Sequence, residues 1–212
     1  MWSGLFVAEG SSDSPLADLV TALFEARGVP VQLTRPDFSL LDDRVRHDVA
    51  SRVEAGRTLM AGRAVDLIVV HRDVDSTTPS ERLTEVQTAL LAVGVDAPLI
   101  PIFPVRMTEA WLLLDEAAIR MVAGNPRGRQ VLSLPKVNEV ERLADPKSRL
   151  REALQAAADV RGRRRTRLDR RFDNNRRQLL ERLDPTGPVT QLSSWVALVA
   201  DVDGATARLS AS

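Results

Sequence analysis

The chain has 212 residues, in which 29 Lys plus Arg balance 29 Asp plus Glu, and it contains neither cysteine nor tyrosine. This length suits one domain with an appendage and is enough to bury a substantial core. Without cysteine there can be no disulfide framework and no zinc ribbon, and without tyrosine there is no tyrosine nucleophile. No apolar stretch approaches the roughly 20 residues of a membrane helix, and MWSGLFVAEG lacks the pattern of a signal peptide. We therefore expect a cytoplasmic protein.

The first half of the chain alternates predicted strands with predicted helices. The expected strands are GLFVAE (4–9), VPVQL (29–33), VDLIVVH (65–71) and APLIPIFPV (97–105). The expected helices are 11–28, with Ser14 as N-cap and Gly28 at its end, and 44–62, 79–94 and 108–124. Residues 65–71 form an unbroken apolar run, typical of a strand buried on both faces. This alternation predicts an α/β fold with a mainly parallel, Rossmann-like sheet flanked by helices.

The pattern changes after about residue 125. A loop, a helix at about 146–159, an arginine-rich stretch and two more helical segments up to about residue 200 are expected, with the last ten or so residues frayed. We therefore predict an α/β domain over residues 1–125. Residues 126–212 are predicted to form a small helical, arginine-rich extension that packs on it.

Positive charge is concentrated in that extension. Residues 161–182 hold ten arginines against three acidic residues, so the rest of the chain is net negative. The arginines proposed to contact phosphates of DNA or RNA are Arg163, Arg164, Arg165 and Arg167. The run could equally be a solvated helix face or a surface for an acidic partner. Phe172 is the one aromatic residue nearby, so base stacking has little support.

Three acidic residues follow two of the predicted strands. Glu9 ends the first strand, and Asp73 and Asp75 follow the third. Because ligands of a parallel sheet bind beyond the carboxyl ends of its strands, these carboxylates can meet in space. On an extended strand Asp73 and Asp75 would point to the same side, roughly 6–7 Å apart. Oxygen ligands without thiolates suit Mg²⁺ or Mn²⁺, so a divalent-metal site is expected here.

The segment after Glu9 is a candidate phosphate cradle. Gly10 would allow a sharp turn and the close approach of a ligand, and Ser11, Ser12 and Asp13 lead into a helix N-terminus. Free N–H groups at a helix N-terminus attract phosphate.

These motifs resemble the TOPRIM domain of topoisomerases, primases and nucleases. Glu9-Gly10-Ser11-Ser12-Asp13 is similar to the start of the OLD-type nucleases, and Asp73-Val74-Asp75 to the later Asp-x-Asp. Glu109-Ala110-Trp111-Leu112-Leu113 resembles a segment of TOPRIM-like proteins found with ATPase partners. The resemblance covers about residues 4–125, and its TOPRIM-like fold and motif order imply a metal-dependent nuclease, with a role in phage defence.

The resemblance also implies roles for single residues. Glu9 would be a metal ligand or general base, and Asp73 and Asp75 would hold Mg²⁺. Asp13 joins this ligand set, and Glu109 could complete a second metal site. Lys136 and Lys147, the only lysines of the chain, would neutralise charge on the phosphate, or their closeness is chance.

Two other functions stay open. Asp73-Val74-Asp75-Ser76-Thr77 also fits the start of HAD phosphatases, with Asp73 as phosphoryl acceptor and Asp75 as acid/base. Such domains normally begin with that strand, whereas here a strand and two helices precede it. The second possibility is a non-catalytic TOPRIM-like module that binds an ATPase, since the chain has no Gly-x-x-x-x-Gly-Lys-[Ser/Thr] loop of its own.

Several of these residues have ordinary structural explanations as well. His71, on a buried strand, is expected to be a core histidine. Trp111 lies at helical spacing with Leu114 and Ala118, which predicts a core position. Glu109 in the first turn of a helix would stabilise the helix dipole in any case.

Overall fold

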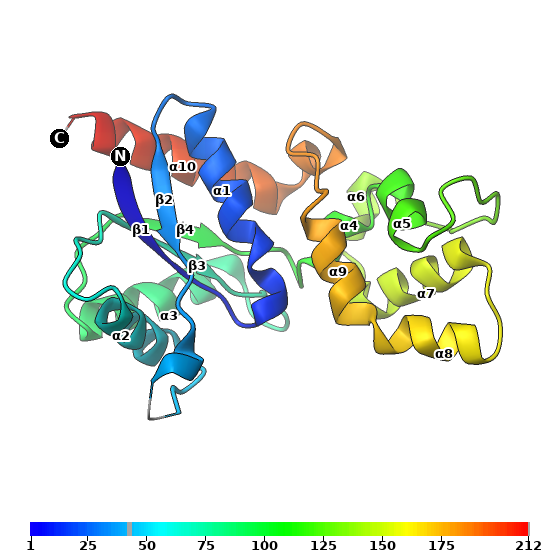
Figure 1. Ribbon diagram of the computed structural model, residues 1–212. Helices are drawn as coiled ribbons and strands as arrows, with labels where there is room; N and C mark the ends of the chain where they lie inside the picture. The colour runs from blue at the N-terminus through cyan, green and yellow to red at the C-terminus, as the bar shows by residue number, and fades with distance from the viewer. Residues whose placement is uncertain (42–43, 212) are drawn as a thin grey trace. The chain divides into compact units, whose positions relative to one another are not determined.

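The computed structural model describes residues 1–41 and 44–211, which form two compact units (Figure 1). The first unit comprises Met1–Phe103 and Ala197–Ser212, and the second comprises Pro104–Val196. The predicted boundary at residue 125 is therefore about twenty residues too late. Residues 104–125 belong to the second unit because their helices pack on other helices of that unit. The predicted packing of an extension on the first domain stays a prediction.

The first unit is built around a parallel sheet. Its strands are β1 (Trp2–Val7), β2 (Val31–Thr34), β3 (Leu67–His71) and β4 (Leu99–Ile102). Its helices are η1 (Ser11–Asp13), α1 (Pro15–Glu25), η2 (Phe38–Leu40), α2 (Val49–Leu59) and α3 (Pro79–Ala92). All pairs are parallel in the order β2-β1-β3-β4. The predicted α/β class with a parallel sheet flanked by helices is confirmed.

The sheet separates two layers of helices. On one face Leu5, Val7, Ile68 and Val70 pack in one buried cluster with side chains of α2 and α3. Alternate strand residues such as Phe6 point to the opposite face, where α1 lies (Figure 1). Arg27, just after α1, forms an ion pair of 2.5 Å with Asp203 near the C-terminus.

The second unit is helical. It contains α4 (Glu109–Leu112), α5 (Glu116–Val122), α6 (Val137–Val140), α7 (Pro146–Ala158), α8 (Arg163–Arg170), α9 (Phe172–Leu180) and η3 (Pro188–Gln191). Helix α10 (Ser193–Ala211) begins in this unit and ends in the first. No helix within residues 1–41 and 44–211 combines the length and the apolarity needed to span a membrane.

Trp111 lies in the core of the second unit. Its ring is buried and meets Trp195 edge to face at 5.3 Å between centroids, and its indole N–H donates to Ser194 Oγ at 2.9 Å. The core position predicted for Trp111 is confirmed. The single helix predicted over 108–124 is wrong, because Asp115 accepts a hydrogen bond from the backbone N–H of Ala118 and starts a second helix there.

Two other predicted boundaries differ from the structure. The helix expected from residue 44 begins only at Val49, where Asp48 accepts from Ser51 N and caps it. The expected fraying near the C-terminus is also wrong, because α10 continues to Ala211 and buries Leu209. Polar caps and an apolar contact with the core decide these boundaries.

Two helical glycines make a matched test of packing between α2 and the sheet. A Cβ on Gly56 would lie 2.9 Å from Leu5 Cδ1, and Leu5 is fully buried, whereas a Cβ on Gly204 of α10 would meet nothing within 4 Å. Overpacking costs about 1–3 kcal/mol, and alanine gains up to about 1 kcal/mol over glycine in a helix. We expect Gly56→Ala to lower the thermal midpoint and Gly204→Ala to raise it. Equal shifts in calorimetry would contradict this packing.

A second prediction concerns Glu141, whose carboxylate accepts from the backbone N–H and hydroxyl groups of Ser193 and Ser194 at 2.7–3.2 Å. Partial burial raises the pKa of Glu141, but these hydrogen bonds outweigh burial and hold it below its usual value. The stabilisation is therefore present above the ordinary glutamate pKa of about 4.3 and lost as pH falls through the lower folded-state pKa.

We expect Glu141→Gln to lower the free energy of unfolding near neutral pH by about 1–3 kcal/mol. This difference in the free energy of unfolding should become smaller at acidic pH, where Glu141 is protonated. The control is Glu25→Gln, on an exposed position of α1. Urea unfolding at several pH values measures both variants, and a pH-independent loss in Glu141→Gln would count against the capping role.

Candidate functional site

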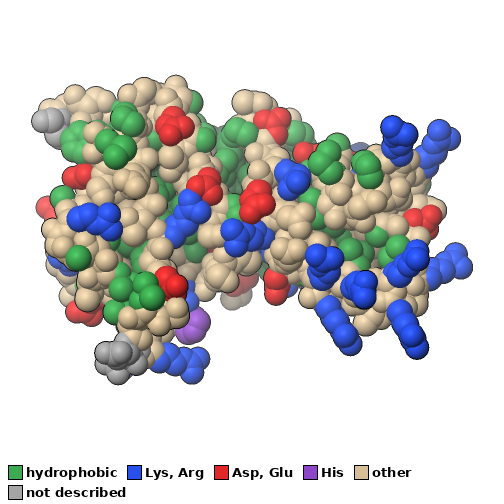
Figure 2. All heavy atoms as spheres, viewed as in Figure 1, with side chains coloured by type: hydrophobic (Ala, Val, Ile, Leu, Met, Phe, Trp, Pro, Cys, Tyr) green, Lys and Arg blue, Asp and Glu red, His purple; other side chains and the backbone are tan. Residues whose placement is uncertain are grey.

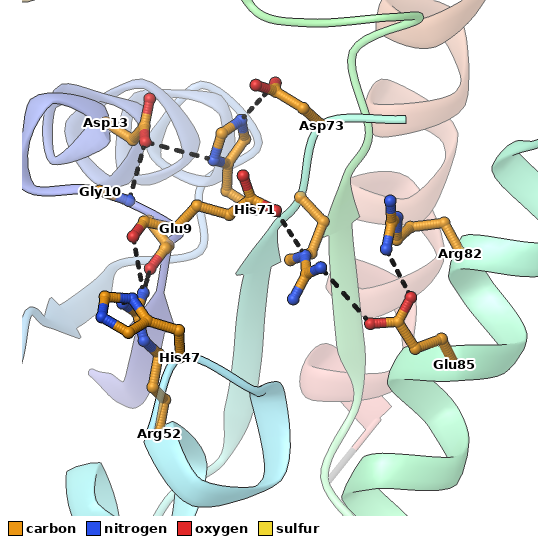
Figure 3. Close-up of polar contacts among 11 residues, drawn as sticks. Glu9, Gly10, Asp13, His47, Arg52, His71, Asp73, Arg82 and Glu85 are labelled. Carbon is orange, nitrogen blue, oxygen red and sulfur yellow. Dashed lines mark hydrogen bonds and ion pairs between the residues drawn. The ribbon is translucent and has the colours of Figure 1, made fainter. Parts of the chain in front are cut away.

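The predicted acidic residues Glu9, Asp73 and Asp75 follow β1 and β3, whose carboxyl ends lie at one edge of the sheet. The two strands pair in register, with Val7 opposite Val70, so their following residues leave the sheet side by side. Figure 3 shows charged side chains from the strand ends, η1, α2 and α3 gathered there. The expectation that residues distant in sequence converge at this edge is thereby supported by the strand register.

His71 lies between two carboxylates at this edge (Figure 3). Its Nδ1 is 3.7 Å from Asp13 Oδ2, its Nε2 is 3.4 Å from Asp73 Oδ1, and the ring is 1% exposed. The buried position predicted for His71 is confirmed. Asp13 arrives from η1, where it is also buried and accepts from the backbone N–H of Gly10 at 3.1 Å.

Glu9 belongs to a second group of charges. Its Oε1 lies 2.6 Å from Arg72 Nε, and Arg72 also reaches Glu85 of α3 at 3.6 Å. Glu85 in turn pairs with Arg82 at 2.5 Å. Acidic and basic groups therefore alternate from the end of β1 to α3.

Arg52 fixes the position of the backbone beside Glu9. This buried cation of α2 donates to the carbonyl oxygens of Ala8 and Glu9, the latter at 2.9 Å. Its other terminal nitrogen lies 2.6 Å from Nδ1 of His47. The guanidinium thus links the start of α2 to the end of β1, where the carbonyl groups no longer belong to the sheet.

The pKa of Glu9 reflects its burial and the charges of some of these neighbours. Burial raises the pKa of Glu9 above its usual value, the positive charge of Arg72 opposes that rise, and the negative charges of Asp73 and Asp75 add to it. Glu9 therefore experiences the charge of both aspartates. This mutual repulsion is what a bound cation would relieve.

The oxygen donors fit a hard cation in chemistry, but they are not assembled around one point. Within residues 1–41 and 44–211 no three His, Cys, Asp or Glu side chains are grouped as metal ligands. Glu9 is turned to Arg72, and Asp73 faces His71. Cation binding would need at least the Glu9 carboxylate to turn, and its side chain is 37% exposed. The ligand set of Glu9, Asp13, Asp73 and Asp75 stays a prediction.

The strand geometry assumed for the two aspartates is wrong. Strand β3 ends at His71, and Asp75 has a φ of 47°, in the left-handed region. Alternation along an extended strand therefore does not relate Asp73 to Asp75. Asp75 is exposed in the loop that leads to α3.

The phosphate cradle predicted after Glu9 also differs in detail. Gly10 has φ −132° and ψ 161°, an extended conformation open to any residue, so no sharp turn requires glycine here. Its N–H bonds to Asp13, whose carboxylate already occupies the N-terminus of η1. Phosphate binding by Gly10, Ser11 and Ser12 stays a prediction, and a phosphate would have to compete with this carboxylate.

The other predicted site residues lie in the second unit. Glu109 is buried in an ion pair with Arg176 at 3.0 Å, which accounts for its carboxylate without a metal. Lys136 is exposed at the start of α6, and exposed Lys147 has its ammonium 5.9 Å from the ring centroid of Phe172. The exposed arginines at the start of α8 are Arg163, Arg164, Arg165 and Arg167.

Arg72 and Arg52, the cations that contact Glu9 and its backbone, were not predicted from the sequence. Arg72 follows the buried strand directly, so period-two alternation places it opposite His71 and on the same side as Val70. Arg52 lies at helical spacing from Val49 and Gly56, on the buried side of α2. A charged residue on a predicted buried face was the available signal in both cases.

Comparison with protein-family models, curated proteins and solved structures finds no match to this chain. The TOPRIM resemblance therefore stays an expectation. It depends on three motifs, which begin at Glu9, Asp73 and Glu109.

The charges around Glu9 predict shifts of opposite sign. Arg72→Gln removes the cation that opposes the rise, so the pKa of Glu9 should increase further. Asp73→Asn removes a negative neighbour, so the pKa should decrease. Titration of the glutamate carboxyl carbons by NMR measures both, with Arg57→Gln on α2 as the control. Shifts of the same sign in the first two variants would contradict the arrangement.

Proposed function

We propose that the chain hydrolyses phosphodiester bonds of DNA or RNA, using a divalent cation, Mg²⁺ or Mn²⁺, held by Glu9, Asp73 and Asp75. The supporting observation is the parallel pairing of β1 and β3, which places Val7 opposite Val70 and brings the segments that carry Glu9 and the two aspartates to one edge of the sheet (Figure 3). Such a cation would supply an activated water and stabilise the leaving oxygen.

The residues around this edge have chemistry that suits the reaction. A half-buried Glu9 with a raised pKa is a better proton acceptor than an ordinary surface carboxylate. Arg72 is paired with Glu9, and a guanidinium binds phosphate as readily as carboxylate. A substrate phosphate that binds Arg72 would break the ion pair between Arg72 and Glu9. The carboxylate of Glu9 could then turn toward Asp73 and Asp75. The resting ion pair therefore becomes a means by which substrate completes the site.

Among the reactions of the TOPRIM families at phosphodiester bonds, hydrolysis is the one that needs neither tyrosine nor cysteine. A chain without tyrosine cannot form the tyrosyl link of a topoisomerase, and one without cysteine lacks the usual zinc module of a primase. An ATPase partner and a role in phage defence are part of the same proposal, and they depend on the family resemblance alone.

The central test is cleavage of plasmid, single-stranded DNA and structured RNA with Mg²⁺ or Mn²⁺. We expect cleavage that needs the cation and is lost in the double variant Asp73→Asn plus Asp75→Asn. Loss of a residue that merely supports a ligand costs about 10–100-fold in activity, so removal of two ligands should cost at least that much.

The matched control is Glu54→Gln plus Asp96→Asn, which removes two exposed acids from the same unit. It should cleave like the unmodified chain. Cleavage that survives the Asp73/Asp75 change, or that is absent with every substrate and both cations, would sink the proposal.

A second candidate is a non-catalytic module that binds an ATPase partner. The observation in its favour is that Glu9 is already paired with Arg72 and that no three-ligand group is assembled in the part of the chain that the structure describes. Calorimetric titration with Mn²⁺ separates the two, because a folded chain without metal binding favours this module. Release of phosphate from small phosphomonoesters, with covalent labelling of Asp73, would instead support a HAD-type phosphatase.

A further inference from the structure

The densest positive charge of the chain lies on and around α8. We call arginine surface the seven arginines of residues 161–171, all of which are exposed. They are Arg161, Arg163, Arg164, Arg165, Arg167, Arg170 and Arg171. Figure 2 shows basic side chains projecting from the face over α8.

Nothing within residues 1–41 and 44–211 neutralises this charge. None of the seven guanidinium groups forms an ion pair or a side-chain hydrogen bond there. The one acidic residue of the segment, Asp169, accepts a hydrogen bond from Gln155 of α7. These guanidinium groups are therefore exposed and accessible to a binding partner.

Neither a buried side chain nor a side-chain cap explains the arginines of helix α8. It contains no buried residue, and its N-cap is Gly162, which provides no side-chain hydrogen bond. Its first turn holds three arginines and no acid, at the end where the helix dipole disfavours positive charge. Arg163 and Arg167 also repel each other at the i, i+4 spacing. A segment that breaks these local rules without gaining burial is expected to have a binding function.

We infer that the arginine surface binds the phosphate backbone of a double-stranded nucleic acid. Arg163, Arg167 and Arg170 lie on one side of α8 and extend over about 10 Å of helix. One strand of a duplex presents a phosphate about every 3.4 Å of its axis, so the row reaches several phosphates of one strand. Guanidinium groups suit such contacts because they donate in a fork.

The surroundings favour a duplex over a single strand. Binding of single strands needs exposed aromatic rings on which bases stack. Phe172, the one aromatic residue of α7, α8 and α9, is buried and has Arg151 at 4.5 Å over its ring. The arginine surface therefore contacts phosphates and does not read bases. The choice of nucleic acid among polyanions rests on the proposed function, whereas the binding itself needs neither Glu9 nor a metal.

The test is equilibrium binding of a labelled duplex by fluorescence anisotropy with a chelator present, so that no metal-dependent cleavage occurs. The variant is Arg163→Gln plus Arg164→Gln plus Arg167→Gln. Its control is Arg127→Gln plus Arg129→Gln plus Arg142→Gln, which removes three exposed arginines from the same unit and leaves the same net charge. Circular dichroism should show both variants folded, because neither set is buried.

We expect the α8 variant to bind the duplex at least about tenfold more weakly near physiological salt, with a salt dependence reduced by about 2 to 3 units of slope. The control should bind like the unmodified chain. The α8 variant should also melt at the same temperature or higher, because substitution relieves repulsion.

Three results would overturn the inference. These are equal losses in both variants, tighter binding of a single strand than of the duplex, and displacement of the duplex by polyglutamate at equal charge, which would indicate an acidic protein partner. Duplex binding without any cleavage would leave this inference standing and count against the proposed hydrolase, so the two fail separately.

Discussion

The parallel register of β1 and β3 is the constraint on which the candidate site depends. Because Val7 pairs with Val70, β1 and β3 end within one residue of each other along the sheet. The buried faces of these strands are apolar, so the register cannot slip by one residue without moving Leu5 and Val70 to the other face. The polar residues that follow the strands inherit this alignment. Core packing thus determines which charges meet at the edge.

Most of the charged contacts described above involve an arginine side chain. Arg72 and Arg52 are held by carboxylates and carbonyl groups at the sheet edge, and Arg176 is buried against Glu109 in the second unit. A planar guanidinium with five donors can serve several acceptors at once, which a lysine cannot do. The arginines of α8 differ from all of these because they have no such partners in the described residues.

The sequence predicted β3 well because every residue of Leu67–His71 is buried within an apolar run. The geometry of parallel sheets also predicted that the carboxyl ends of β1 and β3 lie side by side, as their register shows. It did not predict how the side chains that follow these strands are arranged. Where β3 ends depends on hydrogen bonds to its neighbours, and the left-handed backbone of Asp75 has no signature in residue spacing.

The misplaced boundary between the units has a similar cause. Strand–helix alternation suggested that residues 108–124 cover the sheet. The residue pattern of an amphipathic helix does not show which surface the helix packs against. The hydrogen bond of Trp111 to Ser194 and its contact with Trp195 join segments more than eighty residues apart. Such pairings are decided by three-dimensional packing and are invisible in local periodicity.

The exposed charge of α8 makes this helix respond to salt in two opposite ways. Counterions screen the repulsion among its arginines, so added salt stabilises the helical conformation. The same ions compete with any polyanion for the same guanidinium groups, so added salt weakens binding. High salt therefore makes helix α8 most stable and its affinity for a polyanion lowest. At low salt, a bound polyanion supplies the screening of the arginine charges that the solvent does not provide.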